Sequence, residues 1–418
     1  MEGKRYKTAL VVSRHILDPE YSKCKLLNIR FGNSRDEFGE VWSDLNSLFD
    51  NVVDYDFSNN LVKKGFKATN AEILELVKTK APEFLIIALA FDEHMIDINM
   101  LQKVREAGTR TVGFFVDDLT AMDAVSKMFI PALDFIVTLD SEESVERYRA
   151  YGAKAIFTPS GFSSKRFFKR NLKIQYDVTF IGSNILGRGP FIDELKSKGI
   201  NVKTFGSGWE SGYISNEEMN SIFEQSRINL NFTKTINGKT HFKWRTFEVP
   251  ATGGFMLTEN IPGLEKYFDI GSEIDVFSDA DSCAERIIYY LNNEEKRKEM
   301  AEKAWKRATQ EYTWAKRFEY VFDCIESGDY HNDAKEIPIT EEDWARRSGR
   351  KTLYAMALYA ELGKTKAYKE IVAEARRLPS MSKREKYILT IMGTVPYFLG
   401  RKIISKGISI YLNQNSQK

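Results

Sequence analysis

The chain has 418 residues, and 61 Lys and Arg residues against 59 Asp and Glu residues give a formal net charge of +2. This balance provides no overall attraction to nucleic acid, so no nucleic-acid partner is expected. The length and the 43% hydrophobic content suffice for two core-forming domains and an extension. No apolar run approaches the roughly 18 residues that a membrane-spanning helix needs.

Cysteine usage and the start of the chain favour the cytoplasm. Cys24, Cys283 and Cys324 are far apart and form no CxxC pair, which is typical of free thiols in a reducing compartment. The first residues lack a long apolar stretch before a small-residue cleavage site, so no signal peptide is expected. The four histidines are scattered without ligand spacing, and no metal site is predicted.

The first half of the chain alternates between strand and helix patterns. Strands are predicted at 9–13, 52–55, 84–90, 111–116, 135–139 and 156–158. Helices are predicted between them at 36–49, 70–80, 98–107 and 141–151. Such βα alternation indicates a parallel sheet covered on both faces. We predict a first doubly wound domain over residues 1–165, followed by a polar, basic linker at 160–175.

A second βα series predicts another doubly wound domain over residues 176–328. Strands are predicted at 177–183, 202–205, 228–232, 255–257 and 274–277. Helices are predicted at 188–198, 216–225 and 279–292, followed by a long helical stretch that breaks near Tyr312. Ligands of such sheets bind beyond the carboxyl ends of the strands.

The segment from Lys243 to Glu259 has the pattern of a nucleotide-diphosphate site. Arg245 offers a planar fork of donors suited to a diphosphate, with Lys243 as a second cation. Glu248 can accept two hydrogen bonds from a vicinal diol, such as that of ribose. Gly253 and Gly254 would let the backbone approach a ligand. The alternative is a surface ion pair on a helix that ends at a glycine.

Two further places carry candidate site residues. The glycines of 182–189 have Walker-like spacing without the Lys-Ser/Thr pair, which excludes an NTPase loop. The Gly182-Ser183 turn could still bind a phosphate through backbone N–H groups, or be an ordinary βα turn. Asp117 and Asp118 end a buried strand, where a carboxylate can contact an acceptor hydroxyl or take its proton; alternatively they cap the next helix.

The order of these motifs resembles the C-terminal half of GT-B glycosyltransferases, and most of all the CgeB-like (spore maturation) group of glycosyl transferases group 1. The residues that carry the resemblance are Arg245, Phe247-Glu248, Gly253-Gly254, Thr258, Pro262-Gly263-Leu264, Phe268 with Gly271, and Tyr312-Thr313-Trp314. The match is most specific over residues 175–325 and extends more loosely back to residue 80.

This resemblance implies the GT-B fold, with two Rossmann-like domains facing a cleft, and transfer of a sugar from a nucleotide-diphosphate sugar, with UDP as the expected nucleotide. Lys243 and Arg245 would neutralise the leaving diphosphate without a metal. Glu248 would hold the ribose, and Gly206 and Trp209 would lie beside the base. No cofactor is implied. The expected acceptor is a glycan, a lipid-linked glycan or a protein, as in polysaccharide biosynthesis.

Retention of the anomeric configuration is implied by the same resemblance. Many retaining GT-B enzymes carry a second glutamate eight residues before the one on the ribose, and here that position is Thr240. Two alternatives to this function remain open. One is a non-catalytic GT-B scaffold, and the other is a nucleic-acid glycosyltransferase of phage type.

Residues 331–418 fall outside the resemblance and predict a helical extension. The last 39 residues contain seven Lys or Arg residues and one acid, an excess of 7 − 1 = +6. A basic amphipathic end of this kind can contact an anionic membrane as a peripheral partner. The alternative is a helical cap that packs on the body.

Overall fold

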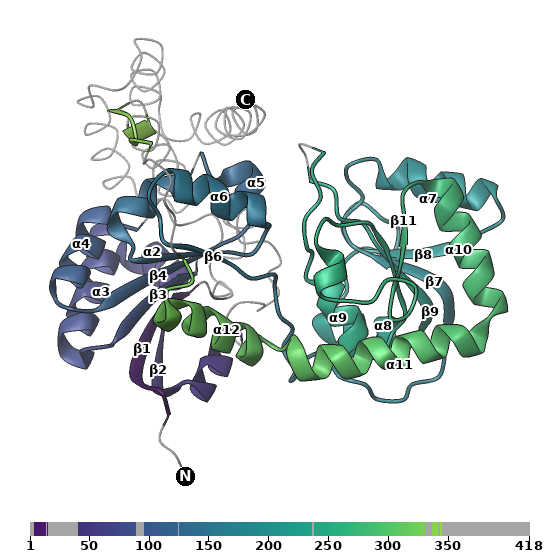
Figure 1. The fold of residues 1–418 in the computed structure, drawn as a ribbon, viewed down its shortest axis with the longest axis horizontal. Helices are drawn as coiled ribbons and strands as arrows, with labels where there is room; N and C mark the ends of the chain where they lie inside the picture. Colours follow the sequence, from purple (N-terminus) through teal and green to yellow (C-terminus); the bar gives the residue numbers. More distant parts are fainter. Residues whose placement is uncertain are drawn as a thin grey trace. The chain divides into compact units, whose positions relative to one another are not determined.

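The computed structural model describes residues 4–13, 15, 41–88, 96–123, 125–235, 238–330, 337–341 and 343–344. These residues form two compact units (Figure 1). The N-terminal unit comprises the described residues up to Thr138, Glu142–Phe157 and those from Cys324 onward. The C-terminal unit comprises Leu139–Ser141 and Thr158–Asp323.

The N-terminal unit is built on a six-stranded parallel sheet with the order β2-β1-β3-β4-β5-β6. Its strands are β1 (Tyr6–Ser13), β2 (Phe49–Asp56), β3 (Phe84–Ala88), β4 (Arg110–Phe115), β5 (Phe135–Thr138) and β6 (Ala155–Phe157). Strand β3 is buried along its whole length. Continuous apolar strands of this kind are typical of parallel sheets with helices on both faces, as the sequence predicts.

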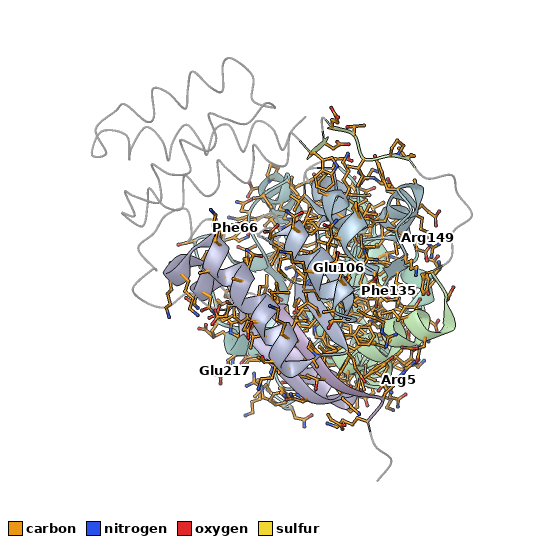
Figure 2. All side chains as sticks on the ribbon, turned by 90° about the vertical axis from the view of Figure 1, so that its left-hand side faces the viewer. Arg5, Phe66, Glu106, Phe135, Arg149 and Glu217 are labelled. Atoms are coloured by element: carbon orange, nitrogen blue, oxygen red, sulfur yellow. The ribbon has the colours of Figure 1, made fainter. Side chains whose placement is uncertain are left out.

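Helices follow most of these strands. They are η2 (Val41–Ser47), α2 (Phe57–Lys64), α3 (Phe66–Lys80), α4 (Ile98–Glu106), α5 (Asp118–Ala121), η4 (Ser126–Ala132) and α6 (Glu142–Ala150). The Asp56 side chain caps α2, and the Asp97 side chain caps α4, each accepting an N–H that the helix itself leaves unpaired. Figure 2 shows the side chains, with Phe66 labelled at the start of α3 and Glu106 at the end of α4.

The C-terminal unit has a five-stranded parallel sheet with the order β11-β10-β9-β7-β8. Its strands are β7 (Tyr176–Ile181), β8 (Val202–Phe205), β9 (Ser226–Asn231), β10 (Met256–Glu259) and β11 (Asp275–Phe277). Its helices are α7 (Arg188–Ser197), α8 (Asn216–Gln225), α9 (Arg245–Ala251), η5 (Leu264–Lys266), α10 (Ala280–Asn292), α11 (Glu294–Glu311) and the first part of α12 (Trp314–Ser327). All strands are parallel, so their carboxyl ends form one edge, which carries the candidate site.

The boundary between the units differs from the predicted linker. Residues from Thr158 onward already belong to the C-terminal unit. Within the expected linker, the Glu224 carboxylate on α8 accepts backbone N–H groups of Arg170, Asn171 and Leu172. A polar segment can thus be packed rather than free, because one buried carboxylate satisfies three donors.

The end of α12 returns to the N-terminal unit. Glu326 accepts hydrogen bonds from Tyr6 Oη at 2.8 Å and from Arg110 Nη1 at 3.0 Å. Further along, Asp343 forms an ion pair with Lys127 at 2.8 Å. Most of the predicted extension, from residue 345, lies outside the described residues. Within the described residues, no helix combines the length and the apolarity needed to cross a bilayer.

Candidate functional site

The loops after β7 and β8 touch at the carboxyl edge of the C-terminal sheet. A Cβ at Gly206 would lie 2.5 Å from the carbonyl oxygen of Gly182, and Gly206 has φ +121°. The Gly182 N–H donates to the Phe205 carbonyl at 2.8 Å, and the Asn184 N–H to the Ser207 carbonyl at 2.8 Å. The loop after β8 therefore fixes the Gly182-Ser183 turn. These two bonds use the N–H groups of Gly182 and Asn184 and not that of Ser183, which lies between them.

Trp209 supports this turn. Its indole Nε1 donates to the Gly182 carbonyl at 2.7 Å, and its ring meets Phe180 edge to face at 6.2 Å. The indole N–H therefore holds the backbone of the turn, and only the partly exposed ring remains for a base.

Two arginines share the Phe180 ring beside this turn. The Arg245 guanidinium lies 5.8 Å from the ring centroid and the Arg188 guanidinium 5.5 Å from it. Arg245 also lies beside Gly182, with Nη2 3.5 Å from the position of a Cβ there. The structure thus brings together Gly182 and Arg245, which lie far apart in the sequence.

Arg188 was not predicted as a site residue. It is 7% exposed, and its Nη1 donates to the Ser183 carbonyl at 3.0 Å. Burial lowers its pKa, and the charge of Glu259 opposes that change. The sequence did contain a signal for Arg188. It is a cation in the first turn of a predicted helix, where the helix dipole disfavours positive charge.

Glu259, at the carboxyl end of β10, is a second residue that sequence reasoning missed. Its Oε2 accepts the Thr233 N–H at 2.6 Å, and its Oε1 lies 3.2 Å from Lys234 Nζ. The carboxylate therefore holds the loop after β9 at the same edge as Gly182 and Gly206. The signal was a carboxylate directly after an apolar strand.

Lys243 lies in the segment that leads into α9 and contacts a buried histidine. Its Nζ contacts Nε2 of His241, and His241 Nδ1 lies 3.6 Å from an Asp140 carboxylate oxygen. Burial, followed by the Lys243 charge, lowers the pKa of His241 to about 3. The imidazole is therefore neutral at physiological pH and accepts from the ammonium group through Nε2.

Glu248 lies one turn into α9 and is 4% exposed. The helix is fixed on the sheet by a buried polar cluster, in which Asn231 Nδ2 donates to Thr246 Oγ1 at 3.2 Å and to Thr258 Oγ1 at 3.1 Å. This contact gives α9, and with it Arg245 and Glu248, a defined place relative to β9 and β10.

Gly253 and Gly254 do not join this edge. They precede β10 and therefore lie at the amino edge of the sheet, opposite to Gly182. A Cβ at Gly253 would meet the Lys169 stem at 3.0 Å, and one at Gly254 would meet the Phe223 carbonyl at 2.7 Å. In this structure these glycines admit close packing of the protein itself, and a ligand role for them stays a prediction.

Asp117 and Asp118 separate into an accessible and a buried carboxylate in the N-terminal unit. Asp118 is 1% exposed, and its Oδ1 accepts hydrogen bonds from Tyr148 Oη and Ser126 Oγ at 2.7 Å each. Asp117 is half-buried and has a left-handed backbone, with φ +56°. Of the two predicted acceptor-side residues, Asp117 is therefore the more exposed.

Asp118 should make stability depend on pH. Burial raises its pKa to about 6, so the folded state binds the proton more tightly than the unfolded chain does. The stabilisation is complete below pH ~4 and is lost as pH rises through about 6, a change of about 2–3 kcal/mol. We expect urea denaturation at several pH values to show that Asp118→Asn removes this contribution, seen as a pH-dependent difference in unfolding free energy from wild type, whereas Asp50→Asn at an exposed position leaves the wild-type profile. An unchanged pH profile in Asp118→Asn would contradict the assignment.

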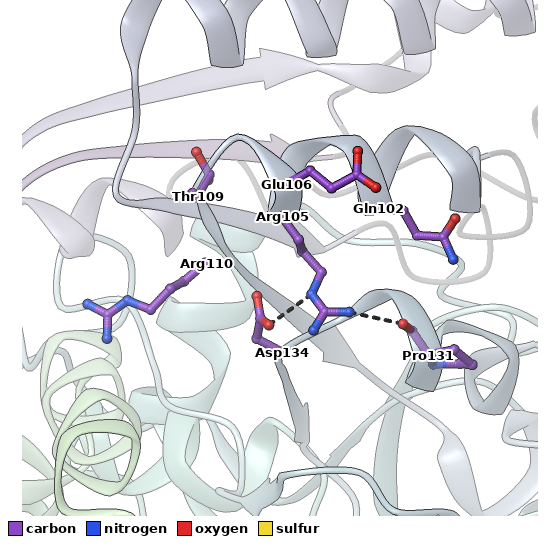
Figure 3. A pocket seen from close by; sticks show the side chains of 8 residues that line it. Gln102, Arg105, Glu106, Thr109, Arg110, Pro131 and Asp134 are labelled. Carbon is purple, nitrogen blue, oxygen red and sulfur yellow. Dashed lines mark hydrogen bonds and ion pairs between the residues drawn. The ribbon is translucent and has the colours of Figure 1, made fainter.

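A shallow hollow of about 630 Å³ lies at the amino edge of the N-terminal sheet, opposite to the carboxyl edge that carries Asp117 and Asp118 (Figure 3). Within it, Arg105 is bound to Asp134 at 2.9 Å and to the Pro131 carbonyl at 3.0 Å. Arg110, also in the lining, is paired with Glu326. The carboxyl edge of the C-terminal sheet is the stronger candidate, because ligands of parallel sheets bind beyond the carboxyl ends of the strands.

A family model matches part of the C-terminal unit. Residues 188–323 match the family model described as "Glycosyl transferase-like". This range contains Arg188, Arg245, Glu248 and Glu259. No curated protein matches the chain.

Solved structures with the same architecture are distant in sequence. Anabaena Alr3699/HepE in complex with UDP has 10% identity and a TM-score of 0.51, over 77% of this chain and 100% of that one. Its complex with UDP-glucose gives 10% identity and 0.50, over 76% and 99%. Sucrose-phosphate synthase (tll1590) from Thermosynechococcus elongatus gives 10% and 0.49, over 77% and 100%. The likeness to Alr3699/HepE concerns the fold, and it confirms the predicted GT-B class.

Proposed function

We propose that the protein is a glycosyltransferase that takes its sugar from a UDP-sugar. The observation that carries this proposal is the pair of arginines, Arg188 and Arg245, which both lie against the Phe180 ring beside the Gly182-Ser183 turn. Planar guanidinium groups are suited to the oxygens of a diphosphate. The UDP complexes of Alr3699/HepE, a protein of the same fold, support the choice of nucleotide.

In the proposed reaction the cations act on the leaving group. Negative charge grows on the diphosphate as the glycosidic bond breaks, and fixed cations at that place lower the barrier. Arg245 and Lys243 would supply this charge, with Arg188 holding the turn through Ser183. Glu248 would bind the ribose hydroxyls. Asp117 would act on the acceptor hydroxyl as a hydrogen-bond partner or base.

Metal independence and retention of configuration are parts of this proposal. The cations around the turn would take the place of the divalent ion that other glycosyltransferases use. We expect transfer or hydrolysis of a UDP-sugar to continue in EDTA at an unchanged rate. Activity that EDTA abolishes and manganese restores would refute this part, and the anomeric configuration of the product would decide between retention and inversion.

The acceptor and the cellular setting are proposed more broadly. A glycan, a lipid-linked glycan or a protein would fit an enzyme of polysaccharide biosynthesis in the cytoplasm, nearest in pattern to the CgeB-like group, with peripheral membrane contact through the basic end. The competing function is a GT-B scaffold without activity. The pair of Arg188 and Arg245 favours the enzyme, because a scaffold without a ligand has no need for two arginines beside one turn at the carboxyl edge of the sheet.

The deciding experiment is calorimetry with UDP, followed by a panel of UDP-sugars tested for hydrolysis in water. UDP binding together with turnover of one sugar supports the enzyme. UDP binding without turnover of any donor, with and without a glycan acceptor mixture, indicates the scaffold. Absence of UDP binding overturns the proposal.

Glu248→Ala should weaken UDP binding. The variant removes charge-assisted hydrogen bonds to the ribose, which contribute about 1.5–3 kcal/mol. Calorimetry with UDP should show this loss. The variant should lower the affinity for 2′-deoxy-UDP by less, because that ligand lacks one of the two ribose hydroxyls. Wild-type affinity in a folded Glu248→Ala variant would remove Glu248 from the ribose site.

A further inference from the structure

Arg317, on α12, is a buried cation without a carboxylate partner among the described residues. Its side chain is 7% exposed, and its Nε and Nη2 atoms are buried without a hydrogen bond in the described part of the chain. Buried arginines are ordinarily paired, because an uncompensated charge is expensive to remove from water.

Three aromatic rings surround this guanidinium. Its carbon lies 4.9 Å from the ring centroid of Phe247, 5.3 Å from that of Tyr267 and 4.7 Å from that of Tyr312. The rings also contact one another, with Phe247 5.2 Å from Tyr312 and 5.9 Å from Tyr267. The Tyr312 hydroxyl donates to the Tyr267 carbonyl. We call these three rings with Arg317 the arginine cage.

The cage holds a positive charge at physiological pH. Burial lowers the pKa of Arg317 to about 10, so the group stays protonated in the cell. Aromatic faces attract a cation most strongly where water is excluded. The cage therefore links α9, the segment after η5 and the start of α12 through one central charge.

Helix α9 has little stability of its own and depends on its neighbours. It has seven residues, with Pro250 inside it, and a helix this short is unstable alone. Proline also removes one intrahelical hydrogen bond. Phe247, the cage member on α9, is completely buried. Arg245 lies two residues before Phe247 and Glu248 directly after it, so a shift of Phe247 would move both.

We propose that Arg317 is a positioning residue, whose guanidinium fixes α9 through the arginine cage and so sets the places of Arg245 and Glu248. The role rests on the proposed function, since it concerns the same nucleotide site. Arg317 touches no substrate in this role. The arginine cage also brings together separate parts of the family-like motif, since Phe247, the segment at Tyr267 and Tyr312 all contact the Arg317 guanidinium.

The test compares Arg317→Met and Arg317→Lys with a matched control. Methionine fills a similar volume and packs on aromatic rings without the charge, and lysine restores charge without the planar group. The control is Arg297→Met on α11. Arg297 is also buried, at 3% exposed, but its Nη1 donates to the Tyr290 carbonyl at 2.9 Å. The full chain is measured by hydrogen exchange, thermal melting and UDP calorimetry.

For Arg317→Met we expect at least about ten-fold faster amide exchange in the 245–251 peptide. We expect UDP affinity about ten-fold weaker and a melting temperature within ~2 °C of wild type. Arg317→Lys should recover part of both losses. Arg297→Met should melt several degrees earlier, because it leaves a buried carbonyl unpaired, with α9 exchange and UDP affinity unchanged.

The outcomes separate the inference from the function on which it rests. Unchanged exchange of 245–251 in Arg317→Met overturns the positioning role, whatever the ligand. A loss of melting temperature in Arg317→Met as large as that in Arg297→Met, with α9 exchange rising no more than in other segments, overturns it too, since Arg317 would then be a general structural residue. Faster α9 exchange in a protein whose wild type does not bind UDP supports the cage and refutes the proposed function alone.

Discussion

Replacing Arg245 with alanine is expected to lower the rate of sugar transfer by about 10²–10³, the usual effect of removing an electrostatic stabiliser of a leaving group. Its guanidinium lies beside Gly182, where the β7 strand ends and the diphosphate is proposed to bind. Charge on the diphosphate grows only as the bond breaks, so turnover should fall more than affinity for the UDP-sugar.

The fold should tolerate this change. Arg245 is the first residue of α9 and is partly exposed, so alanine removes little buried surface and favours the helix. The measurement is kcat and KM for the UDP-sugar, with a thermal melt of each variant. Arg227→Ala is the matched control, since Arg227 is 33% exposed in its side chain and forms ion pairs with Asp177 and Glu294 at the amino edge of the same sheet. A control with the same loss of turnover, or early melting of Arg245→Ala, would assign Arg245 a structural role.

The fold could be predicted because strand and helix patterns are local. Apolar β-rich runs such as 84–88 and 178–181 are typical of strands buried on both faces of a parallel sheet, and their alternation with helical periods indicates the class. The bounds of single elements were less accessible. The predicted helix at 36–49 is described only from Val41, as a 3-10 helix that ends at Ser47, and strand β2 begins at Phe49, because pairing with β1 extends the strand beyond its apolar residues.

The candidate site could be predicted only in short local segments, such as the Gly182-Ser183 turn and the run from Lys243 to Glu248. Lys243, Arg245 and Glu248 lie in one segment and could be found together. Arg188 and Glu259 contribute through the sheet order β10-β9-β7, which brings distant strand ends to one edge and which local patterns do not specify. Gly253 and Gly254 show why a local pattern is ambiguous, since a Gly pair has the same signature whether ligand or protein fills the space beside it.

Gly206→Ala should damage both folding and nucleotide binding. The residue has φ +121°, a backbone conformation that L side chains rarely adopt, and its new Cβ would lie 2.5 Å from the Gly182 carbonyl oxygen. That oxygen belongs to the backbone, which two hydrogen bonds hold in place. The Gly182 N–H donates to the Phe205 carbonyl, and the Trp209 indole N–H donates to the Gly182 carbonyl itself. Because no side-chain rotation can relieve the contact, the loops after β7 and β8 must separate. We expect a loss of at least about 3 kcal/mol in the free energy of unfolding.

Gly212 in the same loop supplies the matched control. It has φ +65°, and a Cβ there would meet nothing within 4 Å, so Gly212→Ala should cost only the strain of a left-handed alanine, about 1–2 kcal/mol. Urea denaturation and UDP calorimetry should therefore separate the two variants, with binding weakened in Gly206→Ala even where the protein remains folded. Equal stability of the two would mean that the close approach of Gly182 and Gly206 is not maintained in solution. Unchanged UDP binding in Gly206→Ala would place the nucleotide away from the contact between Gly182 and Gly206. A diphosphate bound at the Gly182-Ser183 turn would bind more weakly once that turn is displaced.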